Sequence, residues 1–419
     1  MKNVYFLCFV FFIATLFGCT TQSTVQSGTY KFLYDYESRE IHPEYLIYHH
    51  SDDSTTVFFR IKSKELLYAR SGAKSPFVAK LNIRTSMSEV NGAMSDSSSF
   101  FVTDLAKERQ GWLIGSFTIK MPQGMWNVLF EFTDETKNLT QPSYFVADKT
   151  TTYSAQNYLA KKMENNEPVF GGFVSPGQYV ELVSDRNKTS NSANLIHMGG
   201  EVKLPPPPFS NGIPEMPDLA TAPSVELDKT ESGMFAFQAE TGNYFVTHDP
   251  LRKAGITIKI ADTFFPSVKQ VESLQWPLRY ITTKTEHEEI VRNNYPKLMI
   301  DKFWLECAGN KEHARELIKI YYKRVEEANY YFSTFTEGWR TDRGMIHLIF
   351  GNPTKIMRFS DSETWQYGED GTTGLLTFVF RKVESPLSRN VYVLDRDPGF
   401  KQYWERGVQS WRNGRVYND

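Results

Sequence analysis

The sequence predicts a mainly β protein of several domains: two β-sandwich-like domains followed by an α+β domain with a long amphipathic helix and a small antiparallel sheet. Aromatic residues make up 15% of the 419-residue chain, and such side chains favour half-buried pleated surfaces. Between residues 29 and 283, short alternating segments are separated by turn residues, which is typical of sandwiches. After residue 284 the apolar period first becomes helical and then returns to two.

The first β domain is expected over residues 29–150. Its clearest strand follows a turn marked by Pro122 and Gly124, after which every second residue from Trp126 to Phe132 is apolar. Residues 29–36 alternate in the same way, and turn signals separate further strand candidates over residues 44–48, 56–61, 77–83, 99–105 and 111–120.

A second β domain is expected over residues 151–283. The proline run at residues 204–208 interrupts it, and we expect this insertion to be an extended, exposed and stiff loop between strands. The alternative is a ligand for a proline-recognition domain. The predicted strands cover residues 179–183, 193–197, 232–238, 244–248 and 255–260.

The third domain, residues 284–419, is different in kind. Apolar residues recur at intervals of three and four from Ala314 to Phe335, which predicts one face of a long helix. Trp304 belongs to a preceding helix that is broken at Gly309. Turn residues then separate four predicted strands and a terminal helix, over residues 345–350, 355–359, 363–367, 374–381 and 400–411.

The N-terminus has the pattern of an export signal. An apolar run over residues 4–17 follows Lys2, and its length is short for a membrane span of about 20 residues. The run ends in Leu-Phe-Gly-Cys at Cys19, which resembles the lipobox of bacterial lipoproteins. This resemblance implies a signal peptide of residues 1–18, lipid on Cys19 and a lipid-anchored linker over residues 19–28.

The same region predicts location. Thr20, rather than Asp, follows Cys19, and no acidic or lysine-rich tract comes next. We therefore expect anchoring in the outer membrane, facing the periplasm. No later segment approaches 18 consecutive apolar residues, so no membrane span is expected. Cys307 is the only other cysteine of the mature chain, which leaves no internal disulfide and predicts a buried, inert thiol.

Residues 338–344, Gly-Trp-Arg-Thr-Asp-Arg-Gly, join the long helix to the predicted sheet. In a structural interpretation, which we favour, Gly338 adopts the positive φ that ends a helix and Trp339 covers the core. Thr341 and Asp342 accept backbone N–H groups, while Arg340 or Arg343 pairs with Asp342 or Glu363. In the alternative interpretation, a polar pocket binds a ligand or acts as acid and base. That pocket would consist of Asp342, Arg343, His347 and Glu363.

This segment resembles the signature of the GWxTD-domain family, found in envelope proteins of Bacteroidetes and related bacteria, whose molecular role is unassigned. The family motif falls on Gly338, Trp339, Thr341, Asp342, Arg343 and Gly344. The resemblance covers about residues 284–400 and includes the runs at 321–325, 349–353 and 363–367.

The segments 350–353, 365–367 and 376–378 are similar to the small lipoprotein of the barrel-assembly machinery, which has a helix pair before a three-stranded sheet. In this chain a predicted strand over residues 345–350 replaces the second helix. The resemblance implies a protein-binding sheet.

We find no catalytic set in the sequence and expect no cofactor or metal. His49 and His50 are neighbours and would point to opposite faces of a strand, and His42 lies apart from them. A net charge of −2 gives no indication of nucleic-acid binding. The expected function is a non-catalytic scaffold that contacts the membrane through its lipid and binds other envelope proteins, in outer-membrane assembly or secretion. The alternative is an envelope hydrolase of glycan, peptidoglycan or peptide, acting through Asp342 and Glu363.

Overall fold

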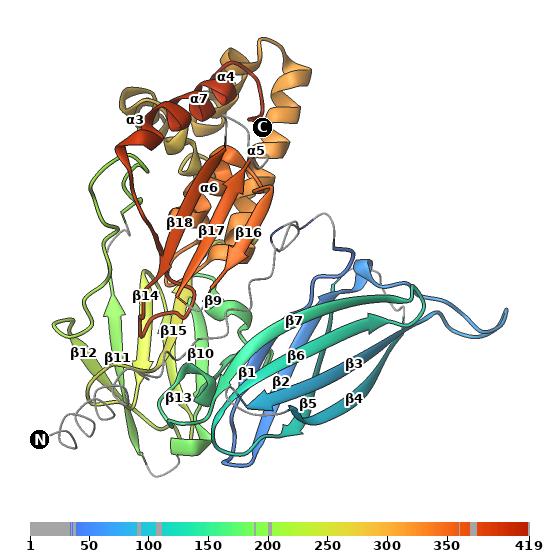
Figure 1. The fold of residues 1–419 in the computed structure, drawn as a ribbon. Helices are drawn as coiled ribbons and strands as arrows, with labels where there is room; N and C mark the ends of the chain where they lie inside the picture. The colour runs from blue at the N-terminus through green and yellow to red at the C-terminus, as the bar shows by residue number, and fades with distance from the viewer. Residues whose placement is uncertain are drawn as a thin grey trace, which may run out of the picture.

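The computed structural model describes residues 34, 36, 39–89, 94–105, 111–187, 190–199, 203–359, 361–368 and 375–417. They form three units, coloured blue to teal, green to yellow, and orange to red along the chain (Figure 1). The two β units lie side by side in this view, and the third unit lies above the second. The expected signal peptide, Cys19 and the linker lie outside the described residues.

The first unit is a β-sandwich, as predicted. One sheet has the order β1-β2-β5, with β1 Glu44–Tyr48, β2 Ser54–Lys62 and β5 Trp112–Lys120. The other has the order β4-β3-β6-β7, with β3 Val78–Glu89, β4 Met94–Leu105, β6 Met125–Asp134 and β7 Leu139–Asp148. All of these strand pairs are antiparallel. Both sheets contribute to one core, in which Phe59, Ile83 and Phe132 are fully buried.

Two parts of the first unit differ from the sequence-based expectation. Strand β7 was not predicted, because it is an edge strand that carries Pro142 and buries few of its side chains. Of the strand expected over residues 29–36, only Tyr34 and Tyr36 are described, and they lie in a turn and a bend. Tyr34 also belongs to a different core, that of the third unit.

The second unit is also built from two sheets around one core. The smaller has the order β13-β10-β8, with β8 Leu159–Lys162, β10 Gln178–Val183 and β13 Phe235–Ala239. The larger has the order β12-β11-β14-β15-β9, with β9 Phe173–Val174, β11 Ser192–Met198, β12 Ser224–Asp228, β14 Asn243–Thr247 and β15 Ile256–Ile260. Only the β15–β9 pair is parallel among these described strands. Leu182, Val246 and Ile258 lie at the centre of the core.

The proline-rich segment is a loop between β11 and β12, as expected, but it is only partly exposed. Pro205 and Pro208 are buried against the third unit. Arg396 donates a hydrogen bond of 2.9 Å to the carbonyl oxygen of Pro206, and the backbone N–H of Asp397 donates one of 3.2 Å to that of Pro208. Because proline lacks an N–H but keeps its carbonyl, an extended proline segment offers acceptors that these donors use.

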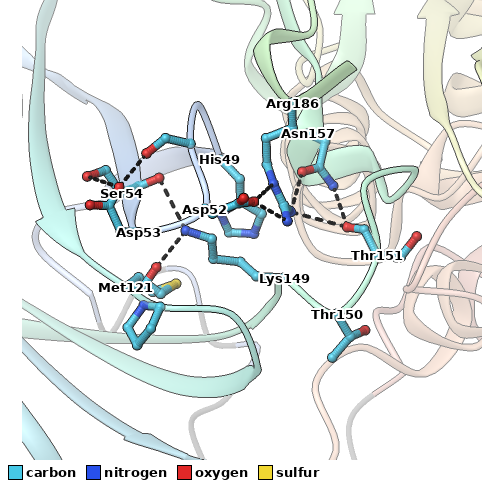
Figure 2. A network of polar contacts seen from close by, with 12 residues as sticks. His49, Asp52, Asp53, Ser54, Met121, Lys149, Thr150, Thr151, Asn157 and Arg186 are labelled. Carbon is cyan, nitrogen blue, oxygen red and sulfur yellow. Dashed lines mark hydrogen bonds and ion pairs between the residues drawn. The ribbon is translucent and has the colours of Figure 1, made fainter. Parts of the chain in front are cut away.

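Polar contacts join the first two units, and a buried lysine lies beside them (Figure 2). The Arg186 guanidinium lies 2.9 Å from a carboxylate oxygen of Asp52 and donates a hydrogen bond of 2.9 Å to Asn157. Lys149, only 1% exposed, donates hydrogen bonds to the carbonyl oxygens of Met121 at 2.6 Å and Ser54 at 3.3 Å. Figure 2 shows its ammonium pointing into the first unit, away from the Arg186 contacts. The two sandwiches are therefore linked through specific polar partners.

The third unit combines helices with one antiparallel sheet. Its helices are α2 Val271–Leu274, α3 Lys284–Arg292, α4 Pro296–Ala308, α5 Lys311–Phe332, α6 Asp342–Phe350 and α7 Lys401–Arg412. The sheet has the order β16-β17-β18-β19, with β16 Lys355–Arg358, β17 Ser362–Tyr367, β18 Leu376–Lys382 and β19 Tyr392–Leu394. In Figure 1 the sheet lies in front of α6. The core includes Leu278, Tyr280 and Ile281, so it begins before the boundary expected at Lys284.

The predicted strand over residues 345–350 is wrong: this segment is helix α6. All nine residues of α6 are buried, so its apolar residues follow no single face, and periodicity cannot distinguish such a helix from a buried strand. Thr341 caps the helix by accepting the N–H of Gly344. The helix pair α5 and α6 therefore precedes the turn at residues 351–353 and the sheet, in the order that the barrel-assembly resemblance implies.

None of the helices in the described ranges is both long enough and apolar enough to cross a membrane.

Candidate functional site

The GWxTD motif is the connection between α5 and α6. Gly338–Arg340 form one turn of 3-10 helix, and Thr341 follows as the N-cap of α6. The Thr341 hydroxyl donates to the carbonyl oxygen of Gly338 at 2.7 Å and accepts from the N–H of Gly344 at 3.1 Å. A single threonine thus holds both glycines of the motif in one compact turn.

The two glycines are required by close backbone contact, not by a positive φ at Gly338 as the sequence suggested. A Cβ atom at Gly338 would lie 1.7 Å from the carbonyl oxygen of Ala328 on α5. A Cβ at Gly344 would lie 2.0 Å from the carbonyl oxygen of Gly338. Helix α5 itself ends earlier, at Phe332. The glycines therefore allow α5, the turn and α6 to pack backbone against backbone.

Trp339 is buried in the core of the third unit, with 2% of its surface exposed. Its ring lies edge-to-face with Tyr280 at a centroid distance of 6.2 Å, and the Arg340 guanidinium lies 4.4 Å from its ring centre. The Tyr280 hydroxyl donates a hydrogen bond of 3.1 Å to the Trp339 carbonyl oxygen. Its position agrees with the expected role of covering the core.

Asp342 makes contacts that the sequence did not predict. It pairs with Arg396, and it accepts the N–H of Leu394 at 2.8 Å. Both partners lie on or next to β19, more than fifty positions away. Burial raises the pKa of Asp342, while the Arg396 guanidinium acts to lower it. Arg340, considered as a partner for Asp342, pairs with Glu337 at 2.7 Å.

Glu363 is fully buried and its carboxylate is surrounded by donors. One oxygen accepts the indole N–H of Trp365 at 2.6 Å. The other accepts the Tyr34 hydroxyl at 2.8 Å, and it lies 3.2 Å from Arg358 and 3.5 Å from Arg343. The predicted contact between Arg343 and Glu363 is therefore present. Tyr34 and Arg358, which complete the cluster, were missed by the sequence analysis.

The four residues of the predicted polar pocket do not meet in one site. Arg343 and Glu363 are in contact. Asp342 instead pairs with Arg396, and His347 lies 3.0 Å from Glu327. The cavity that adjoins Asp342 has a volume of only about 40 Å³, room for little more than a water molecule. Among its described lining residues are Thr341 and Asp342 but neither Glu363 nor His347. This arrangement suits buried ion pairing and gives little access to a substrate.

The other titratable residues singled out in the sequence also have local partners. His49 is buried between Thr55 and Gln156, and burial lowers its pKa to about 3, so its ring is neutral. His50 contacts Thr56, and His42 lies 3.1 Å from Glu65. Within the described ranges, no three His, Cys, Asp or Glu side chains gather to hold a metal. Burial raises the pKa of the Cys307 thiol to about 11, which disfavours the reactive thiolate.

Comparison with known families assigns this region. Residues 242–413 match the GWxTD domain, so the chain is a GWxTD-domain-containing protein. The match extends from strand β14 of the second unit to the end of α7, and so begins some forty residues before the region that carried the sequence resemblance. A search of curated proteins finds no match.

Proposed function

We propose that this protein is a lipid-anchored component of the bacterial cell envelope that acts as a non-catalytic, protein-binding scaffold in outer-membrane assembly or secretion. One observation carries the proposal: the buried charged residues of the GWxTD region, Asp342, Arg343 and Glu363, are engaged in internal ion pairs and hydrogen bonds. Asp342 and Glu363 are 2% and 0% exposed, and donors from the chain itself surround both carboxylates. Their arrangement favours a rigid platform whose function lies on its surface.

The edge strands are the best candidates for that surface. Strand β4 lies at one edge of the first unit and exposes 70% of Phe101. Strand β12 lies at one edge of the larger sheet of the second unit and exposes 65% of Val225. An edge strand presents unpaired N–H and C=O groups to which a strand of a partner can pair, and exposed apolar side chains add contact area.

The anchor would keep these surfaces near the membrane. Tyr34 is built into the core of the third unit, and 15 residue steps separate it from Cys19. A fully extended chain covers about 3.3–3.6 Å per residue, so the tether reaches at most about 50 Å. A lipid on Cys19 would therefore hold Tyr34, and with it the third unit, within about 50 Å of the bilayer.

The alternative function, an envelope hydrolase acting through Asp342 and Glu363, has less support. A general acid or base must reach the proton that it transfers. The Glu363 carboxylate is fully buried among Tyr34, Arg358 and Trp365, and the cavity beside Asp342 holds about 40 Å³.

The anchor is tested by metabolic labelling with radioactive palmitate. We expect the natural chain and Cys307→Ala to incorporate label and to sediment with membranes, and Cys19→Ala to do neither. Cys307→Ala is the matched control, because Cys307 is the other cysteine of the expected mature chain. Label that persists in Cys19→Ala would exclude lipid attachment at this cysteine.

The scaffold role is tested by placing a photo-crosslinking amino acid at Phe101 or Val225 in intact cells. We expect discrete crosslinked species from these two edge positions and none from Leu251, which is 71% exposed but lies outside the strands. The same species should disappear with Cys19→Ala. Edge positions that crosslink no more than Leu251 would contradict partner binding along these strands.

A further inference from the structure

A cavity of about 530 Å³ lies where the three units meet. Its volume is within the range of about 300–1,000 Å³ typical of small-molecule sites. Strands β1, β2 and β5 contribute Tyr45, Arg60 and Trp112 from the first unit, and helix α5 contributes Tyr330 from the third. The second unit supplies the remaining wall, which includes Lys259. No residue of the GWxTD motif lines this cavity.

Lys259 brings a buried positive charge to the cavity. Its side chain extends from β15, and the residue is only 9% exposed. The ammonium donates one hydrogen bond, of 2.9 Å, to the carbonyl oxygen of Thr334 and lies 4.1 Å from the centre of the Phe173 ring. Gly172 leaves room for it, because a Cβ there would lie 3.2 Å from the Lys259 side chain.

This charge has no counter-ion among the described residues, where no carboxylate lies within 4 Å of it. The other charged groups of the lining are already engaged. Arg60 pairs with Glu44 at 2.7 Å, and Lys162 lies 4.0 Å from Glu167. The carboxylate of Asp262 accepts the N–H of Phe264 and the hydroxyl of Ser273. A buried cation is costly unless it is paired, so an anion placed next to the Lys259 ammonium would offset that cost.

The rest of the wall is largely aromatic and held in place. The Arg60 guanidinium lies 4.3 Å from the ring centre of Trp112 and 4.7 Å from that of Phe170. Phe173 and Phe265 stack with a centroid distance of 3.9 Å. Such flat surfaces complement an apolar body that contains a ring.

We propose that the junction cavity binds a monoanionic carboxylate ligand with an apolar, ring-bearing body, its carboxylate on Lys259 and its body against the aromatic wall. One ammonium balances one carboxylate, whereas a phosphate dianion would leave a charge buried without compensation. The ligand is either a free small carboxylate or the carboxyl terminus of a peptide, since both present the same group. This site is independent of the proposed anchoring and of the strand edges.

The test is calorimetric titration of the purified full chain, in detergent micelles, with N-acetylphenylalanine and with a tetrapeptide that ends in phenylalanine. The carboxyl-amidated form of each probe is the control for the charge. We expect the carboxylate forms to bind at least tenfold more tightly than the amides and to raise the melting temperature. If the tetrapeptide binds more tightly than N-acetylphenylalanine, the ligand is the carboxyl terminus of a peptide. If the two bind equally, the ligand is a small carboxylate.

Three variants assign the binding to this cavity. Lys259→Gln removes the charge but keeps a donor for the Thr334 carbonyl, so we expect the folded variant to bind acid and amide equally weakly. Lys302→Gln makes the same chemical change on the exposed face of α4 and should bind as the natural chain does. Trp112→Ala should weaken both forms. The proposal would be overturned if the natural chain bound the acid and the amide equally well. It would also be overturned if Lys259→Gln melted cooperatively and still bound the acid more tightly than the amide.

Discussion

The hydroxyl of Tyr34 donates a hydrogen bond of 2.8 Å to Glu363, a residue 329 positions later in the chain. The Tyr34 ring also packs edge-to-face on Phe332, with a centroid distance of 4.8 Å. Tyr34, the first described residue, is thus part of the core of the third unit, although it precedes the first sandwich in the sequence. The expected tether would therefore be attached to the third unit and not to the first.

Removing this hydroxyl tests the relationship. Tyr34→Phe keeps the ring packing but deprives the buried Glu363 carboxylate of a donor. A hydrogen bond to a charged group contributes about 1.5–3 kcal/mol, so we expect the free energy of unfolding to fall by about that amount. Tyr144→Phe is the matched control, because Tyr144 is 72% exposed and its change should stay within about 0.5 kcal/mol. Equal denaturant midpoints for both variants would contradict a structural role for the Tyr34 hydroxyl.

The sequence predicts local structure well where one face of an element is buried. Strand β1, Glu44–Tyr48, has the predicted bounds, and α5, Lys311–Phe332, lies within three residues of them at each end. In α5 the apolar residues recur with the helical period. Helix α6 was mistaken for a strand because it is buried on all sides and its pattern carries no period.

Contacts between distant segments were predicted less well. The pairing of Arg343 with Glu363 was among the expected alternatives, because the two side chains carry opposite charges. Arg396 and Tyr34 gave no such signal, because each reaches the site only through the fold of a remote segment. Lys259 was missed for a similar reason: in a strand that alternates apolar and polar residues, a lysine predicts an exposed side chain, not a buried one.

The close backbone packing predicts that both motif glycines are essential. Gly338→Ala and Gly344→Ala place a methyl group within about 2 Å of a backbone oxygen, so α5 and α6 would have to separate. We expect each variant to lose more than about 4 kcal/mol of stability, as seen for changes that disrupt a packed core. Gly309→Ala is the control. Gly309 has a φ of +75° but open space around it, so its loss should be about 1 kcal/mol. Comparable melting temperatures for all three would refute the packing argument.

The buried Asp342–Arg396 pair predicts a large effect for a small change. Asp342→Asn leaves the Arg396 guanidinium buried without its counter-charge, and breaking a buried pair in this way costs about 3–5 kcal/mol. This matches the about 3–5 kcal/mol expected for Trp339→Ala, which empties part of the core. Replacing both charges, with Asp342→Asn and Arg396→Met together, should recover part of the loss in urea unfolding. A fully stable Asp342→Asn protein would instead favour a functional role for this carboxylate.

The buried lysine at the junction predicts how stability depends on pH. Burial lowers the pKa of Lys259 to about 7 in the folded chain, from 10.5 for a free lysine. Below pH 7 both states hold the proton, and folding bears the full cost of burying the charge. Between pH 7 and 10.5 only the unfolded chain holds it, so the folded state gains stability as the pH rises, by at most about 1.4 kcal/mol per unit. Lys259→Gln removes this contribution and leaves the other titratable groups of the lining unchanged, namely Glu44, Tyr45, Arg60, Lys162, Glu167, Asp262 and Tyr330. The difference in unfolding free energy between Lys259→Gln and the natural chain should therefore favour the variant near pH 6 and shrink steadily toward pH 10. Parallel stability curves over this range would show that the ammonium of Lys259 is solvated in the folded protein.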